Sequence, residues 1–532
     1  VVPFNHLFYL QNESGQNAAA RPLLGGNPEM EFTASDPANP TVFLGTEADG
    51  KPQAAGFGWV AEDDWMRALF QMLRDGKSAQ VQSRNLALAP GKSIDFTMSI
   101  QTRPTSSYWD FLNDLRRRWK VDDVTIDRAF VWGTTKDAIT GHGTLNQVIS
   151  PWLGLQFDTA AALALDKKYG EAPVPDDELR RFYSYEHRDA IWKELHDAVA
   201  KMHEEVPGVQ VWPMMHPSME VVYKPRIELY PFHGEEILDA KGQPFFDARY
   251  SRSWLPGANS RGWEVLYLEP SKGSKYQAEL VQRIDDAFDK AGMDGIYCDE
   301  FTFSSARKYT RYDYRAWDGY SVVLDGNGNI AAKVTDNAIA TIPNQLSLIA
   351  AVKSHHKKML VNTAPASRAV QNAGIYHFGE AGNGLWQGAT LHLTTPLALG
   401  NVINAPKTSA DVLGISRSLL STGNLHVAYG YYHVMSMIHG KHNFIAEQFP
   451  ITPQTLGAGF VAGPQRIVTS IDHSFKINPD IKAYRLWQYD NSGKLVQENP
   501  AVQKVNPEQR ELELKVPEKG LTIAELLTAL PK

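Results

Sequence analysis

The sequence predicts an α/β protein: an eight-stranded β/α barrel of the TIM type, with a β-sandwich before it and a small β domain after it. Two changes of pattern along the chain indicate this division. Short strand-like runs separated by Gly and Pro turns fill residues 1–125, and they return from residue 466 onwards. Between them, apolar runs of strand length alternate with amphipathic helical segments, which is typical of parallel β/α units. We therefore expect domains at residues 1–125, 126–465 and 466–532.

The composition argues against several kinds of partner and site. The 532 residues are 43% hydrophobic, which is enough for a large core, and no stretch approaches ~20 consecutive apolar residues, so we expect no membrane span. The net charge of −7 provides no electrostatic attraction for nucleic acid. The single cysteine, Cys298, excludes an internal disulfide and any multi-cysteine metal site.

The pattern of short strand-like runs and turns over residues 1–125 predicts the β-sandwich. Their strand-like runs are separated by turn sequences such as Asp-Pro-Ala-Asn-Pro and Ala-Pro-Gly-Lys, which favour chain reversal. A helix over residues 108–119, with Phe111, Leu112 and Leu115 on one face, would lead into the next domain. The expected strands cover residues 30–33, 41–44, 57–60, 79–86 and 93–100.

Residues 126–465 predict the barrel, because about eight β/α units fit this length. The helix expected over 187–206 has Leu195 and Val199 at helical spacing, and Ser274 with Gln277 forms a capping box for a later helix. A doubly wound open sheet is the alternative. The expected strands cover residues 128–132, 209–215, 264–268, 295–298, 358–361 and 375–378, then either 399–403 or 425–429, and finally 467–471.

The last part of the chain, residues 466–532, is again rich in strand-like runs. Strands are expected over 483–489, 494–496 and 510–516, with an Asn-Ser-Gly turn between the first two. A short helix over residues 522–530 is expected to close the chain. These elements predict a small accessory sheet.

The most informative stretch is residues 290–303, in which a helix stops at Gly292 and a short apolar strand ends on two adjacent carboxylates, Asp299 and Glu300. A strand that follows a helix ends at the carboxyl edge of a parallel sheet, where barrel enzymes keep their catalytic groups. Acidic residues are rare in strands and costly to bury unpaired, so this position needs a reason. Strand alternation puts Tyr297 and Asp299 on one side and Glu300 on the other, which favours Asp299 as the inward carboxylate.

A second carboxyl group, Glu380, directly follows the strand expected at residues 375–378. Two carboxylates across a cleft are what glycoside hydrolysis needs, because one attacks or activates water and the other protonates the leaving oxygen. The proton donor needs a raised pKa, which burial beside aromatic rings such as Trp386 would supply. We therefore predict Asp299 and Glu380 as the catalytic pair, with no cofactor and no metal.

The run Gly295-Ile-Tyr-Cys-Asp299 resembles the Gly-x-x-x-Asp ending of the fourth strand in retaining α-glycosidase barrels, which include the α-amylases, the α-galactosidases and the endo-α-N-acetylgalactosaminidases. The order of a β-sandwich, a barrel and a small β domain resembles the last of these. The resemblance implies that Asp299 is the nucleophile and Glu380 the acid/base of a retaining mechanism. Glu-Phe-Thr follows Asp299, so the His that α-amylases carry two residues past this ending is absent.

Several residues at or near expected strand ends are candidates for substrate binding. Aromatic faces suit the apolar C–H faces of sugar rings, and polar side chains suit sugar hydroxyls; core packing or a structural hydrogen bond is the alternative for each. Glu269 is also the second choice for the catalytic carboxyl. The candidates are Glu300, Glu269, His216, Trp132, Trp212, Tyr297, Asn362, His377, Trp386, Tyr431 and His433.

The expected function is that of a glycosidase whose partner is a poly- or oligosaccharide, in a bacterial protein that is secreted or periplasmic. A non-catalytic glycan-binding protein is one alternative, since it would keep the aromatic cleft without needing two carboxylates. A polysaccharide lyase, which needs a Tyr or His base, is another. A metal-dependent hydrolase would want His-x-His after the first strand, whereas that strand is followed by Gly-Thr.

Overall fold

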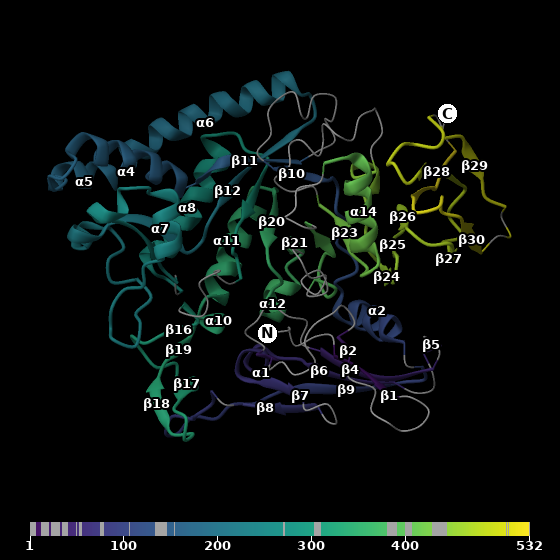
Figure 1. Cartoon of the computed structure of the whole chain (residues 1–532), viewed down its shortest axis with the longest axis horizontal. Coiled ribbons are helices and arrows are strands. Elements are labelled where there is room, and N and C mark those ends of the chain that lie inside the picture. Colours follow the sequence, from purple (N-terminus) through teal and green to yellow (C-terminus); the bar gives the residue numbers. More distant parts are fainter. Residues whose placement is uncertain are drawn as a thin grey trace.

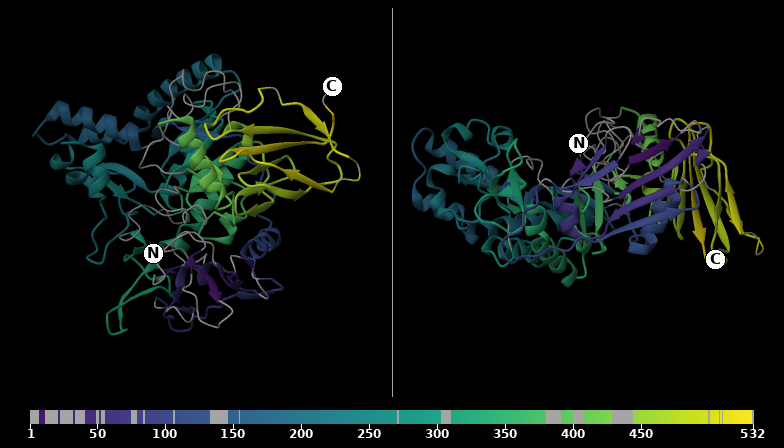
Figure 2. Two further views of the ribbon diagram at one scale, coloured as in Figure 1. Left: turned by 45° about the vertical axis from the view of Figure 1, so that its right-hand side comes forward. Right: turned by 90° about the horizontal axis from the view of Figure 1, so that it is seen from below.

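The computed structural model places a parallel sheet with its helices at the centre, a group of N-terminal strands below it and C-terminal sheets beside it (Figure 1). Figure 2 shows these three groups from two further sides. The structure describes residues 7–11, 21–22, 32–33, 41–48, 51–52, 56–74, 79–83, 85–105, 107–132, 146–153, 155–269, 272–302, 310–379, 391–399, 407–427, 444–498, 500–506, 508 and 510–530.

The N-terminal strands form two sheets. The larger has the order β2-β1-β4-β6-β9, in which β1 runs parallel to β4, and β5 pairs with the far end of β4. Each of the five expected strands overlaps one in the structure. The larger sheet holds β1 (Leu7–Gln11), β2 (Arg21–Pro22), β4 (Thr41–Ala48), β5 (Lys51–Pro52), β6 (Gly56–Ala61) and β9 (Met98–Arg103), and the smaller holds β3 (Phe32–Thr33), β7 (Gln71–Arg74) and β8 (Ala79–Gln82).

Helix α2 (Tyr108–Trp119) covers the larger N-terminal sheet and matches the helix predicted there. Its cap Ser107 accepts a hydrogen bond from the backbone N–H of Asp110, and Lys120 ends the helix in the left-handed conformation. Phe111 of α2 stacks on Phe43 of β4, with ring centroids 5.0 Å apart. The apolar face of the helix therefore packs on the sheet, as the spacing of its apolar residues predicts.

Eight parallel strands form the central sheet, and they follow one another in chain order. This order lacks the reversal that defines a doubly wound sheet, and consecutive parallel strands are what a β/α barrel contains. The strands are β10 (Phe130–Trp132), β11 (Asn146–Leu153), β12 (Gln210–Met215), β15 (Gly295–Cys298), β20 (Lys358–Asn362), β21 (Tyr376–Gly379), β22 (Leu397–Ala398) and β23 (Leu425–His426).

Three strand assignments in this region need correction. Strand β14 (Trp263–Tyr267), predicted as the third barrel strand, pairs antiparallel with β13 (Met219–Tyr223) in a separate two-stranded sheet. The second place in the sheet belongs instead to β11, which the sequence reading missed. Strand β26 (Arg466–Thr469), predicted as the eighth barrel strand, lies in a C-terminal sheet, and the eighth place belongs to β23, within the candidate range 425–429.

The helices of the central region alternate with its strands. In α8 (Lys275–Asp289) the cap Ser274 accepts from the Gln277 N–H, as expected, and Leu280 and Ile284 are buried. Figure 1 shows α4, α5 and α6 on one side of the molecule. Beside α2 and α8, the helices of the described residues are α1 (Asp64–Leu69), α4 (Leu155–Tyr169), α5 (Asp176–Phe182), α6 (Tyr185–Glu205), α7 (Ala248–Trp254), α10 (Asn337–Ala340), α11 (Ile342–Ser354), α12 (Arg368–Gln371), α14 (Ser409–Leu420), η1 (Lys224–Leu229), η2 (Asn259–Arg261) and η3 (Ala446–Gln448).

The C-terminal strands form an antiparallel sheet of six strands and a two-stranded sheet. The helix predicted over 522–530 is wrong: these residues largely belong to β31 (Leu521–Leu527), which pairs with β26 on one side and β28 on the other. Beside β26 and β31, the six-stranded sheet contains β24 (Thr455–Gly457), β25 (Phe460–Ala462), β28 (Ala483–Tyr489) and β29 (Val502–Lys504), and the two-stranded sheet pairs β27 (His473–Lys476) with β30 (Glu511–Leu514). Two further two-stranded sheets elsewhere pair β16 (Tyr312–Asp313) with β19 (Thr335–Asp336) and β17 (Val322–Leu324) with β18 (Ile330–Lys333).

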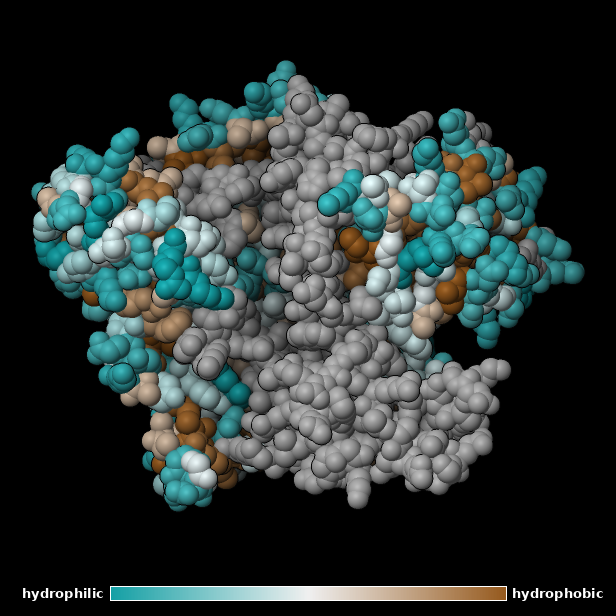
Figure 3. All heavy atoms as spheres, in the orientation of Figure 1, coloured by the Kyte–Doolittle hydropathy of each residue, from teal (hydrophilic) through white to brown (hydrophobic). Residues whose placement is uncertain are grey.

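The surface in Figure 3 is mainly hydrophilic over the described residues, with smaller hydrophobic groups between them. Among the described helices, none is both long and apolar enough to cross a membrane.

Candidate active site

Asp299 directly follows β15, at the carboxyl edge of the central sheet. Its backbone N–H donates to the carbonyl of Met215 at 2.8 Å and so continues the pairing between β15 and β12 past the end of the strand. The strand begins at Gly295, where a Cβ atom would lie 2.6 Å from Cδ2 of the buried Trp212 ring. Glycine at this position lets β15 lie against the indole, and the strand then presents a half-buried Asp299.

Two hydrogen bonds hold one oxygen of the Asp299 carboxylate. The Tyr297 hydroxyl donates to Oδ1 at 2.6 Å, and Asn362 Nδ2 donates to the same atom at 2.8 Å. Asn362 is in reach because Cys298 pairs with Val361, which places the next residue of β20 beside Asp299. Within the described residues Oδ2 accepts no hydrogen bond. Oδ1 is therefore fixed by donors from β15 and from its neighbour β20.

Glu300 lies next to Asp299 but in a different environment. Its carboxylate accepts from Tyr250 Oη at 3.0 Å, His216 Nε2 at 3.2 Å and Tyr267 Oη at 3.4 Å. These donors come from α7, from the residue after β12 and from β14. Only 8% of Glu300 is exposed, and its backbone is left-handed with φ of 46°. The chain therefore turns sharply after Asp299 and sends the two carboxylates to separate partners.

The protonation of the site follows from burial and neighbouring charge. Burial raises the pKa of Asp299, the negative charge of Glu300 raises it further, and His216, Tyr297 and Asn362 act in the opposite direction. His216 Nδ1 accepts from the Ser218 backbone N–H at 3.3 Å, which leaves Nε2 as the donor to Glu300.

Glu269 is a third carboxyl group in this neighbourhood. It is half-buried, two residues beyond Tyr267 of β14. Burial raises its pKa to about 8, and the charges of Asp313 and Glu300 contribute in the same direction. Glu269 therefore keeps its proton to a higher pH than an ordinary glutamate does.

His377 lies on the other side of the sheet from Asp299. Tyr297 and Phe378 have ring centroids 5.7 Å apart, which places them on one face, and alternation then puts His377 on the opposite face. Its Nδ1 lies 2.9 Å from the carbonyl of Thr363, and burial lowers its pKa to about 4. His377 therefore contacts the backbone carbonyl of Thr363 and not the Asp299 carboxylate.

The remaining predicted site residues divide into two groups. Trp212 is fully buried and its ring packs edge-on against Phe130, so we leave it out of the proposed site. Trp132 lies in β10, but its side chain is outside the described part of the structure. Glu380, Trp386, Tyr431 and His433 also lie outside the described residues.

Two tyrosines of the site were not among the predicted site residues. Tyr267 carries a weak signal, because it lies near the end of an apolar strand that ends in Glu269. Tyr250 carries none: it lies in the irregular stretch between two predicted strands, and it reaches Glu300 only because α7 packs beside β14.

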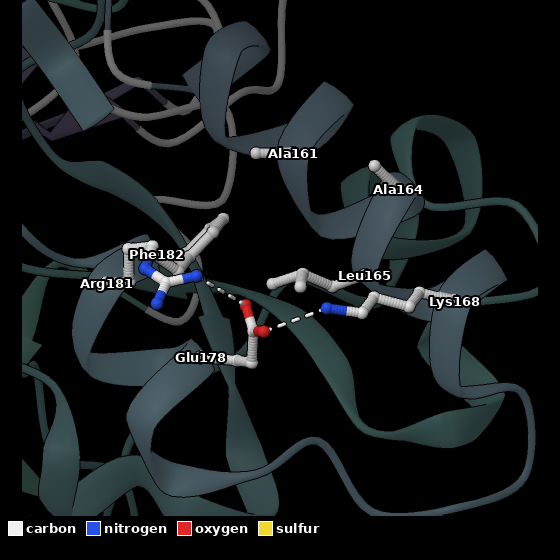
Figure 4. Close-up of a pocket in the computed structure, with 7 residues that line it drawn as sticks. All are labelled: Ala161, Ala164, Leu165, Lys168, Glu178, Arg181 and Phe182. Atoms are coloured by element: carbon white, nitrogen blue, oxygen red, sulfur yellow. Dashed lines mark hydrogen bonds and ion pairs between the residues drawn. The ribbon is translucent and has the colours of Figure 1, made fainter.

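A cavity of about 430 Å³ lies between α4 and α5 (Figure 4). Figure 4 shows Glu178 between Lys168 and Arg181, at 2.8 and 3.6 Å, beside the apolar lining. The described residues that line this cavity are Ala161, Ala164, Leu165, Lys168, Glu178, Arg181 and Phe182, and none of them is a predicted site residue. Among the described residues, no group of three or more His, Cys, Asp and Glu side chains is placed to hold a metal ion.

No family model matches the sequence, and no curated protein matches it. Among solved structures, the chain is similar to a GH31 family sulfoquinovosidase from E. rectale, with 8% identity and a TM-score of 0.42. The match covers 87% of this chain and 72% of the sulfoquinovosidase. The chain is also similar to a Glycoside Hydrolase Family 97 enzyme from Pseudoalteromonas sp. strain K8, with 10% identity and a TM-score of 0.39. That match covers 89% of this chain and 72% of the enzyme. An alpha-N-acetylgalactosaminidase from Bifidobacterium bifidum is 11% identical, with 64% of this chain and 52% of that chain covered and a TM-score of 0.35. TM-scores below 0.5 do not establish a common fold, so the assignment below rests on the site of this chain.

Proposed function

We propose that the protein is a glycosidase that cleaves a poly- or oligosaccharide by a retaining, two-carboxylate mechanism. The observation that carries the proposal is the Asp299 carboxylate, with Oδ1 held by Tyr297 and Asn362 and with Oδ2 accepting no hydrogen bond from the described residues. A carboxylate nucleophile needs one oxygen that is held in place and one that can attack, because the held oxygen fixes the direction of the attack.

In the proposed reaction, Asp299 Oδ2 attacks the anomeric carbon and forms a covalent glycosyl-enzyme. Glu380 is the acid/base implied by the resemblance to retaining α-glycosidase barrels. It protonates the leaving oxygen and then takes a proton from the water that hydrolyses the intermediate. As that water attacks, the bond between Asp299 and the sugar breaks and the carboxylate returns. Tyr297 and Asn362 keep Asp299 oriented through both steps.

We also propose that the central sheet closes into a barrel. Eight parallel strands in chain order support closure, and in barrels the catalytic residues project from the carboxyl ends of several strands. Asp299 and Asn362 come from the ends of two neighbouring strands, β15 and β20, and His216 follows β12.

The proposal is tested by a panel of oligosaccharides and aryl glycosides assayed for new reducing ends, with wild-type protein and Asp299→Asn. We expect the variant to lose at least about 1,000-fold in turnover, because an amide cannot form the glycosyl-enzyme. Asp325→Asn, in the exposed turn between β17 and β18, is the matched control and should keep full activity. Glu380→Gln should lose activity on natural substrates but keep activity on aryl glycosides with good leaving groups, because these groups depart without a proton.

Other outcomes point to other functions. Unsaturated products that absorb in the ultraviolet would identify a lyase. Glycan binding without turnover, unchanged in Asp299→Asn and Glu380→Gln, would identify a binding protein and would end the catalytic assignment.

A further inference from the structure

Glu300 is the most heavily anchored side chain beside the proposed nucleophile. A carboxylate offers about four sites to donors, and Tyr250, His216 and Tyr267 occupy three of them. Both oxygens are engaged, since Tyr250 donates to Oε1 and the other two donate to Oε2. A buried carboxylate with these partners has little capacity left for sugar hydroxyls.

The backbone of Glu300 gives a second, independent observation. A φ of 46° is unfavourable for a residue with a Cβ atom, and such conformations persist where the surrounding structure fixes them. The three donors come from separate elements, so they can hold Glu300 in this turn. Asp299 immediately precedes it and is fixed on its other side by the bond to Met215. The direction of the Asp299 side chain therefore depends on the anchoring of Glu300.

The charge of Glu300 acts on the same neighbour. Asp299 is faced by Glu300 and His216, with Tyr297 and Asn362 as hydrogen-bond donors; Glu300 is also close to Glu269, which in turn is close to Asp313. Within this group the negative charge of Glu300 opposes the ionisation of Asp299. Replacing Glu300 by the isosteric Gln removes this charge and keeps the volume.

We propose that Glu300 is a positioning residue for Asp299, which fixes the turn after the nucleophile, and that it does not bind the sugar. This inference rests on the proposed function for its kinetic consequence. Its electrostatic consequence can be measured without turnover.

The first experiment is a carboxyl titration by NMR of full-length protein labelled with 13C-aspartate, in which Asp299→Asn identifies the Asp299 signal. We expect the pKa of Asp299 to fall in Glu300→Gln, since a negative neighbour has been removed. An unchanged or higher pKa would overturn the proposal. Because no substrate is involved, this result stands even if the search for a glycan substrate fails.

The second experiment measures kcat and KM against pH on the best substrate of the panel. Glu300→Gln should lower kcat about 10- to 100-fold through the loosened turn, and the acidic limb of the kcat/KM profile should move to lower pH. KM should change little. A large rise in KM with kcat and the acidic limb unchanged would show that Glu300 binds the sugar.

Tyr250→Phe keeps the test decisive if Glu300→Gln does not fold. It removes one anchor and keeps the charge of Glu300, so kcat should fall while the acidic limb does not move to lower pH. An effect on KM alone would contradict the proposal.

Discussion

At the scale of single residues, the site contains two neighbouring carboxylates with different partners. Asp299 is half-buried and bound through one oxygen, whereas Glu300 is almost fully buried and bound through both. The alternation of side chains along β15 predicts this separation, and the left-handed turn at Glu300 completes it. The sequence therefore shows that Asp299 and Glu300 end the strand together, and the hydrogen bonds show that the two carboxylates have different partners.

Tyr297 is the residue with the clearest predicted effect on Asp299. Its hydroxyl donates to the carboxylate at 2.6 Å, which stabilises the ionised form and lowers the pKa of Asp299. In Tyr297→Phe the pKa should rise, so the nucleophile is ionised only at higher pH. The acidic limb of the kcat/KM profile should move to higher pH, opposite to Glu300→Gln, and kcat/KM below that limb should fall about 10-fold.

The matched control is Tyr376→Phe in β21. Tyr376 donates to the carbonyl of Thr125 at 3.0 Å and has no hydrogen bond to Asp299. Its loss removes the same hydroxyl group from the same sheet, so the pH profile should stay where it is. An equal shift in both variants would mean that the change reports general loosening of the sheet.

The sequence names Asp299, Tyr297 and Asn362 as candidates, and the structure brings them together, because each lies at or next to the end of an apolar strand and such ends meet at one edge of a parallel sheet. The sequence does not name Tyr250. The contact between Tyr250 and Glu300 joins residues 50 positions apart through α7, and no local pattern encodes it.

At the scale of elements, local pattern predicted most strands but not always their partners. The apolar run in β14 is the same whether the strand pairs in the central sheet or with β13, so only the tertiary structure distinguishes the two. In β31 the run Leu-Thr-Ile-Ala-Glu-Leu-Leu includes good helix formers, yet it lies between two paired strands, and these pairings override the propensity.

Gly295 offers a test of how β15 is positioned. A Cβ atom there would lie 2.6 and 2.7 Å from Cδ2 and Cζ2 of Trp212, whose ring is fully buried against Phe130. Gly295→Ala should therefore lower the free energy of unfolding by about 1–3 kcal/mol through overpacking. It should also reduce activity, because the strand that carries Asp299 has to move. Thermal unfolding and turnover measure the two effects.

Two further variants separate this mechanism from a general effect of the added methyl group. Trp212→Phe in the Gly295→Ala background makes room, so the double variant should be more stable than the sum of the single changes predicts. Gly414→Ala adds the same methyl within α14, where the described residues outside the helix's own backbone leave open space around it, and should stabilise by about 1 kcal/mol. Strict additivity of the first pair would contradict the steric explanation.

At the scale of the whole molecule, one buried arginine connects three distant parts of the chain. Arg116 of α2 is fully buried and donates to the carbonyls of Thr394 at 2.9 Å and Pro453 at 2.5 Å, and also to that of His392. Burial lowers its pKa to about 10, so it remains charged at neutral pH. Its partners belong to the segment between β21 and β22 and to the chain just before β24. Arg116 therefore joins the N-terminal helix to both the central and the C-terminal regions.

Arg116→Met should lower the stability of the whole molecule by about 3–5 kcal/mol, because it leaves several buried carbonyls without a donor. The neighbouring Arg117 is the matched control: its side chain is 56% exposed and pairs with Asp114, so Arg117→Met should change stability by no more than about 0.5 kcal/mol. Differential scanning calorimetry measures both. Since the lost bonds link separate regions, we also expect the unfolding of Arg116→Met to spread into more than one transition, with the C-terminal sheet separating from the rest. A single transition at the wild-type temperature would show that the regions are held together without Arg116.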